Sequence, residues 1–197
     1  MNKFTLAAVC CVAALAVVAG NAGEAHAKRG TVGFGVGTDL RLGVPTSLGN
    51  IVVPIHISDS LAIEPEFGFV RNATEQGDNS TSDLNLRLGT GIFFKNAITK
   101  KTNIYGGGRL GIIFNSGNVT IGDNEVDTSQ TSFFVGGVSG AEFFINDAFS
   151  LGGEWGIYFT SIGEEEVDGE DGGDDEEAAS QSIISTTTMI YFRYYFM

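Results

Sequence analysis

His56 is the residue best placed for proton-transfer chemistry, because Ser58, Asp59 and Ser60 follow it closely in the chain. Histidine, serine and aspartate are the residue types of a nucleophilic relay in which the imidazole acts as general base. Here all four fall within a short extended segment and a tight turn. Neighbours this close cannot readily turn toward one another. We therefore predict that His56 packs inside the protein and that the chain is not an enzyme.

The densest charge lies between Glu164 and Glu177, which together hold ten of the 24 Asp and Glu residues. Such a block repels itself and is commonly disordered, and no EF-hand register can be laid over it. We expect a solvated surface loop. The alternatives are a diffuse Ca²⁺ or Mg²⁺ site, with no other cofactor, or a basic partner such as a cationic peptide or host protein. The candidate metal ligands are Glu164, Glu165, Glu166, Asp168, Glu170, Asp171, Asp174, Asp175, Glu176 and Glu177.

Two other classes of binding protein are excluded by composition and motif. The formal net charge is -13 and there is no basic stripe, which argues against nucleic-acid binding. The segments GFGVG and GGGRLG are rich in glycine, but neither is followed by a helix or by Lys-Ser/Thr. They therefore do not match a phosphate-binding loop.

The N-terminus has the pattern of a cleavable signal peptide. Lys3 precedes the apolar run Phe4–Ala19, and Ala25-His26-Ala27 has the small-x-small pattern of a cleavage site. We predict a signal peptide over residues 1–27 and one domain over residues 28–197. Both cysteines lie inside the apolar run, so the exported domain has no disulfide and no thiolate metal site.

Turn residues divide the exported domain into eight strand-like runs, and several of these runs alternate apolar and polar residues. Their lengths suit tilted membrane strands, which need about 9–11 residues. The predicted strands are Thr31–Gly43, Asn50–Ile57, Leu61–Arg71, Asp83–Phe94, Thr102–Asn115, Gln130–Phe144, Phe149–Thr160 and Ile183–Phe196.

The connections between these runs alternate in length. The turns at 58–60, 95–101 and 145–148 are short, whereas 72–82, 116–129 and 161–182 are longer and polar. Of the connections in this second set only the first, 44–49, is short. Short turns at one end and long loops at the other are typical of an outer-membrane barrel. We therefore predict an all-β, eight-stranded, antiparallel up-and-down transmembrane barrel with long polar extracellular loops.

The alternation also predicts which residues face the barrel interior. If the apolar stripes face lipid, the opposite set contains the mid-strand charges and no lysine. In a narrow interior these charges must be paired, and arginine can engage carboxylates in two directions. The predicted charge network is Asp39, Arg41, Glu64, Glu66, Arg87, Arg109, Glu142, Glu154 and Arg193.

The chain resembles the small eight-stranded outer-membrane barrels of the OmpA/OmpX type, within the broad outer membrane β-barrel domain family. The resemblance is carried by the hairpins ISDSLAIEPEFGFV and INDAFSLGGEWGIYF and by the closing strand YFRYYFM. It implies a place in the outer membrane of a Gram-negative bacterium, among outer-membrane lipid and lipopolysaccharide. It also implies that the barrel-assembly machinery recognises the C-terminal strand, although Met197 follows the usual terminal aromatic residue here. The residues of that C-terminal signal are Ile190, Phe192, Tyr194 and Phe196.

Three functional classes remain open. The first, which we favour, is a non-enzymatic and monomeric membrane barrel that is structural or interacts through its loops. The second is a narrow channel of low conductance. The third is a soluble exported barrel that holds an apolar ligand, as lipocalins do. The third class requires the opposite phase, with aromatic side chains inside and arginines outside.

Overall fold

The computed structural model describes residues 30–39, 49–77, 79–122, 124–169 and 181–196. These residues form nine antiparallel strands in one sheet that closes on itself. The signal peptide predicted over residues 1–27, and most of the acidic segment, lie outside the described residues. The strands are β1 Val32–Asp39, β2 Gly49–Val52, β3 Ile55–His56, β4 Leu61–Gln76, β5 Asn79–Thr99, β6 Thr102–Ile121, β7 Asn124–Phe144, β8 Phe149–Gly169 and β9 Gln181–Phe196.

The ring has eight strand positions, because β2 and β3 together fill one of them. Both strands pair with β1 on one side and with β4 on the other, and the register is the same before and after the break. The break falls at Pro54, which has no N–H to donate to a ladder. Pairing of β1 with β9 closes the ring. The predicted eight-stranded up-and-down barrel is therefore confirmed.

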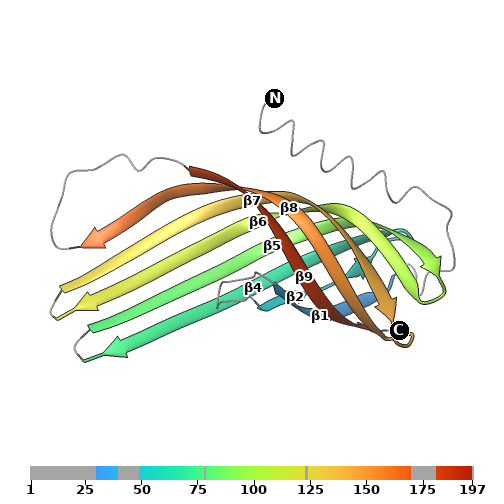
Figure 1. Ribbon diagram of the computed structural model, residues 1–197, viewed down its shortest axis with the longest axis horizontal. Helices are drawn as coiled ribbons and strands as arrows, with labels where there is room; N and C mark the ends of the chain where they lie inside the picture. The colour runs from blue at the N-terminus through green and yellow to red at the C-terminus, as the bar shows by residue number, and fades with distance from the viewer. Residues whose placement is uncertain (1–29, 40–48, 78, 123, 170–180, 197) are drawn as a thin grey trace.

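One end of the barrel, here called the lower end, carries the short connections (Figure 1). These span residues 57–60, 100–101 and 145–148. Strand β5 continues to Thr99, so the connection predicted at 95–101 is only Lys100 and Lys101. The chain reaches the same end at Phe196, the last residue of β9.

At the opposite, upper end, two predicted long loops are wrong, and the third, predicted at 161–182, is shorter because β8 continues to Gly169 and β9 begins at Gln181. Strands β4 and β5 continue as a hairpin until Gln76 pairs with Asn79, and β6 and β7 until Ile121 pairs with Asn124. The intervening residues are Gly-Asp in both cases, and Gly77 and Gly122 have φ of 64° and 61°. This left-handed conformation is the one that two-residue hairpin turns require, and glycine adopts it without strain.

The longest strands therefore run well beyond the closed ring (Figure 1). Pairing of β2 with β4 stops at Phe69, and pairing of β8 with β9 stops at Ile162. Past those points the described pairings join only β4 to β8. We call this part the extension; it comprises residues 70–76, 79–85, 115–121, 124–130 and 163–169.

The described residues include no helix that is both long and apolar enough to cross a bilayer.

Candidate functional site

The barrel interior gathers charged side chains from β4 to β9. In a strand, alternate side chains point to opposite faces. In β4 the even-numbered positions from Ala62 to Gly68 are buried, while Phe67 and Phe69 are exposed. The other long strands alternate in the same way. Charges at the buried positions therefore face one another across a narrow lumen.

Arg109 lies at the centre of this interior and is only 1% exposed. Its Nε and Nη2 donate to the two carboxylate oxygens of Glu154 at 2.8 and 2.9 Å. Its Nη1 donates to Glu66 at 2.8 Å, and its Nη2 also donates to Glu64 at 2.6 Å. One guanidinium group thus binds three carboxylates, which a single lysine ammonium could not do with the same planar geometry.

Arg193 of β9 extends the network toward the lower end. Its Nε and Nη2 lie 3.0 and 2.9 Å from Oε2 of Glu64, and its Nη1 lies 3.8 Å from Glu142. Room for this side chain comes from Gly35 of β1, where an added Cβ would lie 2.8 Å from Arg193 Cγ. Glu64 therefore sits between two arginines that come from different strands.

The lower part of the network contains a cation that the sequence interpretation missed. Lys95 Nζ donates to Glu142 at 3.0 Å, and the hydroxyls of Tyr195 and Ser150 each donate to Glu142 at 2.6 Å. The prediction of an interior without lysine is wrong. Strand β5 continues past Phe94, so Lys95 falls in phase with the inward-facing Phe93 and is buried.

Arg87 marks the upper limit of the network. Its Nε donates to Glu66 at 2.8 Å, and its guanidinium lies 4.0 Å from the centroid of the Phe134 ring. Stacking on an aromatic face stabilises a cation that water reaches only poorly. Arg87 is 6% exposed, so this layer too is closed to bulk solvent.

The charges of the described interior balance. Four carboxylates, from Glu64, Glu66, Glu142 and Glu154, face the cations of Arg87, Lys95, Arg109 and Arg193. Each of these eight charged groups has at least one ion-pair partner among the others. An unpaired charge at such depth would be very costly, so the pairing is what permits these residues to be buried.

Two residues of the predicted network cannot be placed in it. Asp39 ends β1, and its side chain lies outside the described residues, as does the whole of Arg41. Of the acidic segment, the structure describes the side chain of Glu164 alone, which is exposed, and the backbone as far as Gly169. The described residues contain no cluster of three or more acidic, histidine or cysteine side chains able to hold a metal ion.

His56 is buried beside the lower part of the network, as predicted. Its ring lies 5.5 Å from the Tyr195 ring, and neither ring nitrogen has a side-chain hydrogen-bond partner. Ser58 Oγ instead accepts hydrogen bonds from the backbone N–H groups of Ser60 and Leu61, which shape the turn. The described geometry therefore does not join His56 to Ser58 in a relay.

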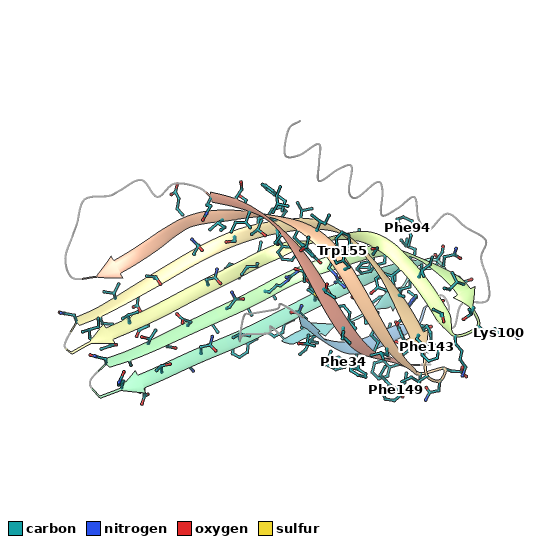
Figure 2. The ribbon with its side chains drawn as sticks, in the orientation of Figure 1. Phe34, Phe94, Lys100, Phe143, Phe149 and Trp155 are labelled. Atoms are coloured by element: carbon teal, nitrogen blue, oxygen red, sulfur yellow. The ribbon has the colours of Figure 1, made fainter. Side chains whose placement is uncertain are left out.

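The outer surface of the ring is apolar. Phe34, Phe94, Phe143, Phe149 and Trp155 project from it, each between 43 and 49% exposed (Figure 2). The interior holds the paired charges, packed among buried aromatic side chains such as Phe134 and Tyr195, and the exterior is apolar and carries no arginine of the network. This is the phase of a membrane barrel rather than of a lipocalin. The C-terminal residues share this outer face; they are Ile190, Phe192, Tyr194 and Phe196.

Comparison with known families identifies a match over residues 4–187 to the model described as outer membrane protein beta-barrel domain. A search of curated protein sequences found no match. Among solved structures, a major outer membrane protein from Thermus thermophilus is 14% identical, with a TM-score of 0.54 over 84% of this chain and 98% of the other.

Two further solved structures are similar at lower scores. Ail, the attachment invasion locus protein of Yersinia pestis, is 12% identical over 84% of this chain and 94% of its own, with a TM-score of 0.46. Neisserial surface protein A is 14% identical over 84% of this chain and 95% of its own, also with a TM-score of 0.46.

Proposed function

This chain belongs to the outer membrane protein beta-barrel domain family of Gram-negative outer membranes, and from that premise we propose a non-catalytic surface-interaction role. In such barrels the strands turn back close to the membrane on the periplasmic side, and the longer excursions of the chain beyond the ring lie on the exterior. The lower end is then periplasmic, and the extension stands outside the cell. The barrel anchors the protein, and the extension meets its partner.

The observation that carries this proposal is the contrast between a filled interior and a long exposed sheet. An eight-stranded ring has just enough space for its own side chains, and here paired charges occupy it. By contrast, no described side chain of the extension is buried. Ordering five strands beyond the membrane costs conformational entropy, and little burial offsets it. A binding role for the exposed surface of the extension would account for that cost.

The charge of the extension favours a basic partner. Five described carboxylates of the extension are exposed, against one exposed cation, Arg71; they are those of Glu75, Asp83, Glu125, Asp127 and Glu164. Asn118 Nδ2 donates to both Glu125 and Asp127 at 2.7 Å, so these two carboxylates are held on one face. A cationic peptide or protein would neutralise them, and Ca²⁺ or Mg²⁺ at the acidic segment would act in the same sense.

The barrel itself makes two kinds of contact that anchor the protein in the membrane. Lipid and lipopolysaccharide surround the aromatic outer face, and the barrel-assembly machinery recognises the apolar side of β9. A monomer suffices for both contacts. A filled lumen also predicts that the protein conducts ions poorly, so frequent and well-defined conductance steps in planar bilayers would contradict the proposal.

The direct test uses an oligolysine peptide as the probe and the protein in lipid nanodiscs. We expect binding that weakens with salt, and we expect loss of most binding when residues 118–121 and 124–127 are deleted. The Asp59→Asn variant, altered at the periplasmic end, is the matched control and should bind as the wild type does. Equal binding by the deletion variant would contradict a role for the extension. Added Ca²⁺ should compete with the peptide and slow hydrogen exchange in the acidic segment.

A further inference from the structure

The only histidine of residues 28–197 is enclosed at the lower end of the barrel. His56 is the last residue of β3 and is 1% exposed, although the turn at 57–60 follows it directly. Both nitrogens of its imidazole are buried and have no hydrogen-bond partner. A neutral imidazole has one N–H donor and one acceptor nitrogen, and here both are unused. Burial of unpaired polar atoms costs free energy, so this position calls for an explanation.

The surroundings of His56 come from both ends of the barrel sequence. Its backbone N–H donates to the Thr31 carbonyl at 2.9 Å, and its carbonyl accepts from the Gly30 N–H at 2.8 Å. On β4 its cross-strand partner is the apolar residue Ala62. On the opposite side the imidazole lies 5.5 Å from the ring of Tyr195 in β9, the strand that closes the barrel. His56 therefore packs where the first strands meet the last one.

The charged groups that act on the imidazole are two cations and one carboxylate. They are Lys95 of β5, Arg193 of β9 and Glu142 of β7. Glu142 already accepts hydrogen bonds from Lys95 at 3.0 Å and from two hydroxyl groups at 2.6 Å each. A proton on His56 would thus bring a third cation to this layer and give the balanced interior an excess positive charge.

Protonation of His56 and its burial therefore oppose each other. An imidazole in water binds a proton near pH 6.5. Inside the barrel the resulting cation would lose its hydration without gaining a free carboxylate, which is very costly. A short movement toward the turn at 57–60 would return the imidazolium to water. That movement would also remove the side chain that packs against Tyr195.

We propose that His56 makes closure of the lower end of the barrel sensitive to acid. At neutral pH the uncharged imidazole fills the space beside Tyr195. In acid the imidazole binds a proton and moves out toward the turn, and the layer of Lys95, Glu142 and Tyr195 loosens. The layer around Arg109 stays closed, because its ion pairs join carboxylates to guanidinium groups and involve no imidazole.

Hydrogen exchange of the barrel in lipid nanodiscs, from about pH 7.5 to about pH 4.5, tests this proposal. In the wild type, protection of the amides of β3 and of the last residues of β9 should fall about tenfold for each pH unit below about 6.5, because opening binds one proton. His56→Phe retains an aromatic ring that cannot bind a proton, so its protection should stay level. His56→Leu is a second version should the first variant fail to fold.

Two controls separate this opening from a general effect of acid. Asp59→Asn removes a titratable side chain of the neighbouring turn and should keep the wild-type pH dependence. Amides near Arg109 should stay protected in every variant. Loss of protection there together with the lower end would overturn the proposal, because the whole barrel would then be opening.

Three further results would also overturn it. One is wild-type protection that does not change with pH. Another is an equal loss of protection in the wild type and the His56 variants, which would assign the effect to carboxylates. The third comes from NMR, where the single imidazole of residues 28–197 gives an unambiguous signal. We expect this signal to change together with protection at the lower end, and proton uptake with unchanged protection would contradict the proposal.

Discussion

The extension continues five strands of the barrel, β4 to β8, yet the two regions are organised in opposite ways. Within the ring each strand has a charged interior face and an apolar exterior face, and Arg109 is shielded almost completely. Beyond the ring neither face is buried, and polar residues such as Thr74 and Asn79 are found on both faces. The difference shows that continuous hydrogen bonding can carry a strand far from the region that stabilises it.

The boundary between the two regions is marked by an irregularity. Between Gln130 and Ser132 the β7–β8 register shifts by one residue, next to the last pairing of β8 with β9. An extra residue in one strand bends it and increases its twist. The sheet is thereby redirected where it leaves the ring, and side chains of β8 beyond this point change face.

The largest difference between the regions should come from removing an arginine. Arg109→Leu removes the cation that pairs with the buried Glu154 carboxylate. It should lower the free energy of unfolding by about 4 kcal/mol. Arg71→Leu, in the extension, should change it by less than about 0.5 kcal/mol. Urea unfolding followed by Trp155 fluorescence measures both, and equal midpoints would refute the contrast.

A second comparison uses two glycines of β6. At Gly111 an added Cβ would clash with the backbone oxygen of Leu88, whereas at Gly117 its nearest neighbour is the Thr128 side-chain hydroxyl at 2.7 Å. A backbone atom cannot move aside as a side chain can. Gly111→Ala should therefore cost about 3 kcal/mol, and Gly117→Ala well under half of that. A gel that compares boiled with unboiled samples would show loss of the compact, fast-migrating form only for Gly111→Ala.

A third comparison concerns neighbouring tyrosines on the two faces of β9. Tyr195→Phe removes the hydroxyl that donates to Glu142 at 2.6 Å and should destabilise the barrel by about 2 kcal/mol. Tyr194 faces lipid and is 39% exposed, so Tyr194→Phe serves as its control with little effect expected. Similar urea midpoints for the two variants would mean that the Glu142 contact adds nothing to stability.

The smallest effect should come from shortening the extension. Deletion of residues 118–121 and 124–127 retains the Gly122-Asp123 turn and joins it to the cross-strand partners Gly117 and Thr128. The ring is untouched, so the unfolding free energy should change by less than about 1 kcal/mol. A collapse of stability in this variant would show that the two regions are energetically coupled.

The sequence predicted the ring more fully than it predicted the extension. Period-2 alternation identifies the inward face of each strand, and with it the burial of Glu64, Arg109 and Arg193. The partners of these residues depend on strand tilt and register, which one sequence does not determine. In the extension, polar residues on both faces remove the alternation. There the repeated Gly-Asp-Asn at 77–79 and 122–124 was the available indication of tight hairpins.

The ion pair between Arg193 and Glu64 joins residues 129 positions apart. Contacts so distant in sequence form late, because the intervening chain must be ordered first. Here the chain supplies Arg193 only with its final strand, after every carboxylate it neutralises has emerged. A polypeptide truncated before β9 would therefore lack one of the two arginine partners of Glu64. It would also have no strand to pair with β1, so the ring could not close.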